Sequence, residues 1–173
     1  GYYKDPEKTA EVLKDGWFHT GDIGVIEDGF LRITDRKKEI FKTSGGKYVA
    51  PTLLENALKA SLFIEQVIVV GENRKHPAAL IVPDAVVVEE WCTRHDHAFP
   101  GMAGIAGDDR LRARIEQEVN ELMAPFAKWE QVKKFTILPA PFTIDGGELT
   151  PTLKLKRKPI MAKYGDAVEA MYA

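Results

Sequence analysis

Hydrophobic residues recur along this chain with two spacings, which distinguish predicted helices from predicted strands. Apolar residues three or four positions apart predict amphipathic helices, because one helical turn takes about 3.6 residues. Short apolar, β-branched runs that end at glycine or proline predict strands. The predicted helices cover 9–13, 51–62, 88–95, 108–124 and 159–171, and the predicted strands cover 23–26, 30–34, 39–43, 66–70, 78–82 and 135–138.

Two pairs of these strands are expected to form hairpins. Asp28-Gly29 separates the first pair, and this dipeptide tolerates the positive φ angles that tight turns need. The polar link 72–77 joins the second pair. Segments rich in glycine and turn-forming residues are predicted to be loops: 44–47, 99–107 and 144–152. Short antiparallel strands interleaved with helices predict a small α+β domain.

The helix predicted from Pro51 has one apolar face, formed by Leu54, Ala57, Leu58 and Leu62. These spacings place all four residues on one side of an amphipathic helix.

Composition excludes several classes of protein. Hydrophobic residues make up 45% and charged residues 29% of the 173 positions, a balance typical of globular domains. The net charge of -2 provides no overall attraction to nucleic acid. The single cysteine, Cys92, excludes an internal disulfide and fits a reducing cytoplasm. No apolar stretch approaches the roughly 18 residues of a membrane span. The chain begins at Gly1 without methionine or a signal sequence, so we expect a piece of a longer protein.

The segment His19-Thr20-Gly21-Asp22 is a first candidate binding site. A carboxylate on a glycine bend can accept hydrogen bonds from the two vicinal hydroxyls of a ribose. Asp22 can equally cap a turn, and the spacing alone favours that structural role.

The segment 35–47 is a second candidate, because it combines basic residues with the glycines of Ser44-Gly45-Gly46-Lys47. Ammonium groups and free backbone N–H groups can bind phosphate. It is not a Walker A loop, since Tyr48 follows Lys47 and the required upstream glycine is missing. A run of charge alone more often forms a solvated surface.

Basic and apolar residues alternate through 149–158. As a strand, this segment would place Lys154, Lys156 and Lys158 on one side. It is then either an exposed edge protected by lysines or an arm that delivers one lysine into an anion site.

Cys92, His95 and His97 lie close enough in sequence to suggest metal ligands. A metal site needs a further ligand that the sequence does not provide. Because Cys92 shares an apolar stripe with Val88 and Trp91, we expect it to be a core residue and predict no metal site.

Five motifs occur in one order along the chain: GYY at 1–3, DGWFHTGDIG at 15–24, DRKKEI at 35–40, SGGKYVAP at 44–51 and LTPTLK at 149–154. The series resembles the C-terminal part of AMP-forming acyl-CoA synthetases, the adenylate-forming superfamily. The glycine loop and the final lysine motif are most similar to the long-chain fatty acid–CoA ligase branch. Members form an acyl-adenylate from a carboxylic acid and ATP, then transfer the acyl group to the thiol of coenzyme A.

The resemblance implies roles for matching residues. Asp22 matches the aspartate that binds the ribose hydroxyls, and Arg36 matches an arginine that also reaches the ribose. Lys154 matches the lysine needed for adenylation, and Lys38 matches the hinge about which the small domain turns. Three residues match the loop that lines the pantetheine channel: Ser44, Gly45 and Gly46.

The resemblance also implies a domain organisation. Residues 1–35 would be the tail end of the N-terminal adenylation domain, including its last hairpin, and 36–173 the mobile C-terminal lid. ATP or AMP, CoA and Mg²⁺ would bind to the complete enzyme, whose partners are the N-terminal domain, a fatty acid, ATP and CoA. The fragment alone is expected to be inactive and to bind none of these. We expect a cytoplasmic protein, with peripheral membrane contact of the complete protein left open.

Two alternatives remain. In the first, the chain is a stand-alone α+β binding module whose basic arm, 154–163, binds RNA, a phosphoinositide or an acidic protein. The net charge of -2 and the lack of aromatic residues among these lysines argue against nucleic acid. In the second, the phosphopantetheine of a carrier protein replaces CoA as acceptor. The absence of a carrier-like serine motif favours CoA.

Overall fold

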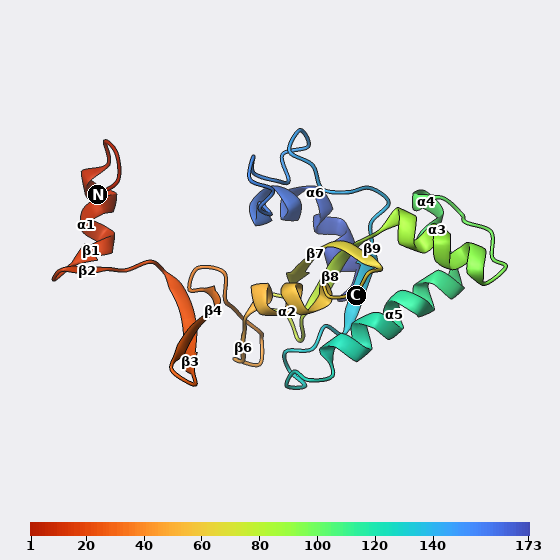
Figure 1. Ribbon diagram of the computed structural model, residues 1–173, viewed down its shortest axis with the longest axis horizontal. Helices are drawn as coiled ribbons and strands as arrows, with labels where there is room; N and C mark the ends of the chain where they lie inside the picture. The colour runs from red at the N-terminus through yellow and green to blue at the C-terminus, as the bar shows by residue number, and fades with distance from the viewer.

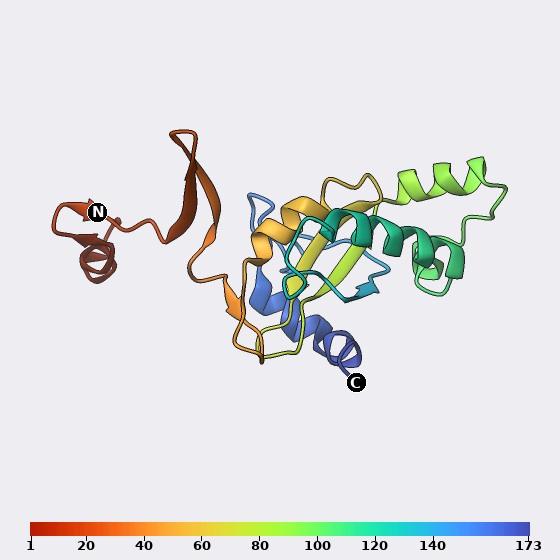
Figure 2. The same cartoon turned by 90° about the horizontal axis from the view of Figure 1, so that it is seen from below.

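The computed structural model describes residues 1–173, apart from the side chain of Asp35. An N-terminal segment projects from one side of a larger body (Figure 1). The segment contains one helix and two small hairpins: α1 (Pro6–Val12), β1 (Leu13–Lys14), β2 (Trp17–Phe18), β3 (Asp22–Glu27) and β4 (Phe30–Arg36). Figure 2 shows the same separation from below, with the β3–β4 hairpin between α1 and the body.

The hairpin predicted around Asp28-Gly29 is confirmed. Strands β3 and β4 pair antiparallel, from Glu27 opposite Phe30 to Asp22 opposite Arg36. Asp28 and Gly29 have φ angles of 52° and 81°, which is the geometry that the dipeptide favours.

The body consists of a three-stranded sheet, a small hairpin and the remaining helices. The sheet has the order β7-β8-β9 and contains β7 (Ile64–Val70), β8 (Ala78–Pro83) and β9 (Lys134–Ile137). The small hairpin pairs β5 (Phe41–Lys42) with β6 (Tyr48–Val49). The helices are α2 (Pro51–Leu58), α3 (Ala85–Arg94), α4 (Met102–Ile105), α5 (Asp109–Met123) and α6 (Arg157–Ala170). The predicted α+β class is confirmed.

Strand β9 departs from the expectation of antiparallel strands, because it pairs parallel to β8. Helices α3, α4 and α5 lie between the two strands in sequence and return the chain to the starting end of β8. A crossover of this length permits parallel pairing, whereas a tight turn does not.

Both faces of the sheet are covered. Figure 2 shows α6 on one side of the sheet and α2 with α5 on the other. Side chains alternate accordingly along β8, with Ala79 and Ile81 in the core beneath α2 and α5, and Leu80 and Val82 in the core beneath α6. Strand β8 is buried throughout its length, so it forms the centre of both cores.

Leu62 was predicted to lie on the apolar face of the helix from Pro51, but it follows the end of that helix and is 77% exposed. Helix α2 ends at Leu58, and a turn in which the Ala60 N–H donates to the Ala57 carbonyl follows it. The helical spacing therefore stops before Leu62, while Leu54 and Leu58, which do share one face of α2, are buried.

Two segments predicted from composition also differ. The stretch 99–107, predicted to be a loop, contains the single-turn helix α4, which buries Ile105. The stretch 149–158 does not form a strand: it has only one bridge, between Leu149 and Leu155, and Leu153 has a φ of 58°. Lysines in this stretch consequently do not share one strand face.

Among the described residues, no helix combines the length and apolar character needed to cross a lipid bilayer.

The central position of β8 leads to a stability prediction. Replacing Leu80, which is fully buried, with alanine should lower the free energy of unfolding by about 3 kcal/mol, because it removes apolar contacts and leaves a cavity. The matched control, Leu62→Ala, should change it by less than about 0.5 kcal/mol, since Leu62 is exposed. Urea unfolding of both variants tests this. Equal losses would contradict the assignment of the core.

Candidate functional site

A groove of about 610 Å³ brings together three of the residues predicted for function: Asp22, Arg36 and Lys154. Its first wall is the open end of the β3–β4 hairpin. Its second wall is formed by α2 and by the loop that leads into α6. Residues separated by more than a hundred positions in sequence therefore line one concave surface.

Asp22 and Arg36 form an ion pair at the hairpin end of the groove. They are cross-strand partners, and Arg36 Nε lies 3.1 Å from Asp22 Oδ1. The preceding bend is fixed by the Asp22 N–H, which donates to Thr20 Oγ1 at 3.1 Å, and by the Lys37 N–H, which donates to the Gly21 carbonyl at 2.8 Å. With a polyhydroxyl ligand, the carboxylate can accept hydrogen bonds and the neighbouring guanidinium can donate them.

Lys154 lies in a tightly bonded loop, but its side chain is exposed to the groove. The Thr150 N–H donates to the Lys154 carbonyl at 2.8 Å, and the Lys154 N–H donates to Thr150 Oγ1 at 3.0 Å. The Lys156 N–H then donates to the Glu148 carbonyl at 2.7 Å. The backbone is held in place while the ammonium group stays available to a ligand.

Arg157, the first residue of α6, anchors this loop in the body. Its Nη2 donates to Glu55 Oε1 at 2.6 Å and its Nη1 donates to the Val69 carbonyl at 2.9 Å. The Val69 N–H donates to the same Glu55 oxygen at 2.8 Å. Burial raises the pKa of Glu55 above its usual range, although Arg157 and the Val69 amide oppose the shift. No sequence pattern indicated this contact, because Glu55 and Arg157 are 102 positions apart.

A second buried carboxylate, Glu148, organises the other end of the loop. Its side chain accepts hydrogen bonds from Lys163 Nζ and, at 3.1 Å, from the Thr143 N–H. The hydrogen bond from Lys163 lowers the pKa of Glu148, and the Thr143 bond adds to the effect, while burial opposes it. Gly146 is required here, because a Cβ atom at this position would lie 2.1 Å from a Glu148 oxygen.

The predicted glycine loop lies outside this groove. Ser44, Gly45 and Gly46 form the turn between β5 and β6, where Gly46 has a φ of 79°. The Ser44 N–H donates to the Arg74 carbonyl at 2.9 Å, and Lys47 Nζ lies 5.2 Å from the Trp129 ring centroid. The turn is thus exposed to solvent but attached to the body at both ends.

Lys38, predicted to be the hinge, lines a separate groove of about 580 Å³ between the β5 region, β7 and α6. Its neighbour Glu39 lines both grooves. The segment that contains Lys38 therefore runs between the two concave surfaces.

The cysteine and histidines serve structural contacts. Cys92 is buried in the core, as predicted. The His95 ring stacks on Trp91 at a centroid distance of 4.3 Å, and His97 Nε2 lies 2.6 Å from Asp108 Oδ2. Within the described part of the chain, no group of three or more His, Cys, Asp or Glu side chains could hold a metal ion.

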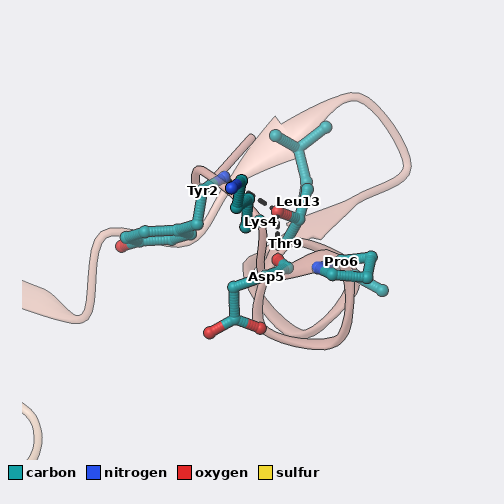
Figure 3. Close-up of a pocket in the computed structure, with 7 residues that line it drawn as sticks. Tyr2, Lys4, Asp5, Pro6, Thr9 and Leu13 are labelled. Atoms are coloured by element: carbon teal, nitrogen blue, oxygen red, sulfur yellow. Dashed lines mark hydrogen bonds between the residues drawn. The ribbon is translucent and has the colours of Figure 1, made fainter.

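A further pocket, of about 530 Å³, lies against α1 in the N-terminal segment (Figure 3). The polar groups of this pocket hydrogen-bond to one another around the N-terminus of α1. The Tyr2 N–H donates to Thr9 Oγ1 at 2.8 Å, and the Thr9 hydroxyl donates to the Asp5 carbonyl at 2.8 Å. None of the residues predicted for function lines this pocket.

The sequence is similar to a known protein family and to characterised enzymes. The family model described as the AMP-binding enzyme C-terminal domain matches residues 38–173, so the chain belongs to this family. The chain is 44% identical, over 99% of its length, to the long-chain-fatty-acid–CoA ligase FadD15 of Mycobacterium tuberculosis. It is 39% identical, over its whole length, to the human long-chain-fatty-acid–CoA ligase 1. The chain spans 29% and 25% of the lengths of these two relatives.

The fold is shared with solved structures of adenylate-forming enzymes. The adenylation domain of a carboxylic acid reductase from Segniliparus rugosus, solved in complex with AMP and a co-purified carboxylic acid, is similar with a TM-score of 0.78 and 29% identity. The similarity covers 99% of this chain and 26% of that one. Nucleotide binding is thus present among proteins that share this fold.

The Glu148–Lys163 contact predicts a pH dependence of stability. The pKa of Glu148 is lower in the folded state than the ordinary value of 4.5, so ionised Glu148 stabilises the fold above that pH. This contribution is lost as the pH falls from 4.5 through the folded pKa. Glu148→Gln should have a lower free energy of unfolding at neutral pH and a flatter acid profile. Urea unfolding between about pH 3 and pH 7 tests this.

The control for this measurement is Glu65→Gln, at an exposed position on β7, whose profile should follow the wild type. A Glu148→Gln profile parallel to the wild type at all pH values would contradict the assignment.

Proposed function

We propose that this chain is the C-terminal part of a long-chain fatty acid–CoA ligase, which converts a fatty acid, ATP and CoA into acyl-CoA, AMP and pyrophosphate through an acyl-adenylate. The observation that carries the proposal is the single groove lined by Asp22, Arg36 and Lys154. The names of the relatives support the substrate class, and the AMP-bound structural relative supports the nucleotide.

In this proposal, residues 1–35 belong to the larger N-terminal domain and 36–173 form the mobile lid. The distribution of buried side chains supports this division. Among the side chains described in 1–36, none is buried, whereas the apolar core begins at Phe41. The first 36 residues instead expose large apolar side chains: Tyr2, Tyr3, Leu13, Trp17, Phe18, Val25, Ile26, Phe30, Leu31 and Ile33. An exposed apolar surface of this kind is typical of a segment that packs against a partner domain.

Asp22 accepts hydrogen bonds from the ribose hydroxyls in the proposed site, and Arg36 reaches the same sugar. The ion pair between them supports this role, because it holds the Asp22 carboxylate in one orientation. A carboxylate has two acceptor oxygens, which suits the two adjacent hydroxyls of a diol better than a single hydroxyl.

Lys154 is the proposed catalytic residue of adenylation. Adenylation brings the carboxylate of the fatty acid against the α-phosphate of ATP, and the two anions repel each other. An ammonium group about 4 Å from either anion contributes on the order of 4 kcal/mol at an effective dielectric constant near 20. The fixed backbone around Lys154 supports this role, since a pre-oriented charge needs no reorganisation in the transition state.

Thioester formation needs different groups, because the thiol of CoA must reach the acyl carbon. We assign Ser44, Gly45 and Gly46 to the pantetheine channel in this second step, and Lys38 to the hinge that exchanges the two arrangements. A methyl group added at Gly45 or Gly46 would meet no atom beyond the adjoining residues closer than 3.9 Å, so a narrow ligand can approach their backbone. The Mg²⁺ ion and the acyl pocket belong, in this proposal, to the N-terminal domain.

The role of Lys154 predicts a selective defect. In the complete ligase, Lys154→Ala should slow acyl-adenylate formation by roughly two to three orders of magnitude, because the charge between the two anions is lost. Thioester formation from supplied acyl-adenylate should be unchanged. Pyrophosphate exchange and single-turnover thioester assays measure the two steps. Lys134→Ala, on an exposed position of β9, is the control and should affect neither.

The division into domains predicts that the isolated chain is inactive. The purified 173-residue protein should form no acyl-CoA from fatty acid, ATP and CoA, and should bind ATP too weakly for titration calorimetry at micromolar concentrations. Acyl-CoA formation by the pure chain would show that the groove alone is sufficient.

A further inference from the structure

The two walls of the groove are joined by a short covalent connection. Asp22 and Arg36 lie in the β3–β4 hairpin, and Lys154 lies in the body. The hairpin ends at Arg36 and the body begins at Phe41, and a single turn connects them. In this turn the N–H groups of Glu39 and Ile40 donate to the Arg36 carbonyl at 2.9 Å and 3.3 Å. The distance between the Lys154 ammonium and the Asp22–Arg36 pair therefore depends on the conformation of residues 37–40, together with the contacts of β4 against α2.

Glu39 is the residue of this turn that contacts the body through its carboxylate. Thr52 Oγ1, in α2, donates to Glu39 Oε2 at 3.2 Å, and Arg157 Nε lies 3.6 Å from the same oxygen. Among the residues that the structure describes, this is the ion pair that connects segment 37–40 with the body.

Arg157 thus faces two carboxylates with different surroundings. The Glu55 side chain is 7% exposed and is held by the Val69 N–H of β7 as well as by Arg157. The Glu39 side chain is 40% exposed, and its contact with Arg157, at 3.6 Å, is longer than the Glu55 contact at 2.6 Å. The first contact fixes Arg157 in the body, while the second can break and re-form at little cost, because water solvates the separated carboxylate.

Arg157 lies close to Lys154 along the chain and belongs to the same fixed loop. The two residues are separated by Leu155 and Lys156, and the Lys156 N–H is bonded to the Glu148 carbonyl. Because Glu55 already fixes Arg157, the Glu39–Arg157 contact holds segment 37–40, and with it the β3–β4 hairpin, in one orientation relative to Lys154.

We propose that Glu39 is a positioning residue, which through Arg157 holds Lys154 opposite Asp22 and Arg36 during adenylation and releases the lid when it turns for thioester formation. The inference rests on the proposed function, since it deepens the role assigned to the same groove. Glu39 touches neither the nucleotide nor the fatty acid in this account.

The test uses Glu39→Gln in the complete ligase. The amide keeps the size of the side chain and the acceptor for Thr52, but it removes the charge that attracts Arg157. Acyl-adenylate formation should fall about fivefold to tenfold, because a shift of Lys154 by about 1 Å is sufficient for such a loss. Thioester formation from supplied acyl-adenylate should stay within about twofold of the wild type.

The exposure of the Glu39–Arg157 contact provides a second readout. Raising the salt concentration from about 0.05 to 0.5 M should reduce adenylation by the wild type more than adenylation by Glu39→Gln, since salt screens a half-exposed ion pair. The control Glu65→Gln, on the exposed side of β7, should match the wild type in both half-reactions and in its salt response. The melting temperatures of all variants are compared, and that of Glu39→Gln should stay close to the wild type.

A second variant, Arg157→Lys, retains the charge but loses the planar guanidinium that contacts Glu55 and Glu39 together. It should also slow adenylation more than thioester formation. The positioning role is overturned if Glu39→Gln slows both half-reactions equally or slows neither. Lys154→Ala, measured in the same assays, distinguishes failure of the proposed function from failure of this inference. If Lys154→Ala shows no selective defect in adenylation, the proposed function fails. If Lys154→Ala shows the defect and Glu39→Gln does not, this inference alone fails.

Discussion

The buried contact between Glu55 and Arg157 holds together the parts of the body that form the groove. Glu55 belongs to α2, Arg157 begins α6, and both bond to the backbone of Val69 in β7. Removing two charges from water is costly, and the raised pKa of Glu55 reflects that cost. The contact satisfies the N–H and the carbonyl of Val69 in β7, an edge strand of the sheet, and fixes the start of α6. A buried pair of this kind contributes geometry more than net stability, because the cost of removing both charges from water offsets most of their attraction.

The loop that contains Lys154 is fixed at both ends by such carboxylates. At one end Glu148 pairs with Lys163, and at the other Glu55 pairs with Arg157. The pKa values of the two carboxyl groups shift in opposite directions, because burial dominates at Glu55 and hydrogen bonds dominate at Glu148. Between them Lys154 is exposed. An ammonium group buried in a salt bridge is not accessible to a ligand, whereas Lys154 stays accessible because the loop is held rigid by its neighbours along the chain.

Local sequence patterns predicted the elements that depend on near neighbours. The Asp28-Gly29 hairpin and the helix from Asp109 to Met123 agree with their turn and spacing signals, because both are decided by contacts within a few residues. The parallel pairing of β9 with β8 and the Glu55–Arg157 contact could not be predicted, since each joins segments far apart in sequence. In the sequence, nothing distinguishes Arg157 from the basic residues around it, Lys156 and Lys158. The resemblance to acyl-CoA synthetases selected Asp22, Arg36 and Lys154, and they do line one groove, whereas their chemical roles remain predictions.

The groove lies where two parts of the chain with different packing meet. The wall that contains Lys154 rests on a closed core, while the wall that contains Asp22 and Arg36 comes from a hairpin without buried side chains among those described. The first wall is therefore rigid by itself, and the second takes its position from whatever covers its exposed apolar residues and from segment 37–40. Lys154 on one wall and the Asp22–Arg36 pair on the other can be brought together or separated by rotation about that short segment. Rotation there breaks the surface contacts of β4 and Glu39 with the body but no contact within its buried core, so alternation between two arrangements requires no unfolding of either part.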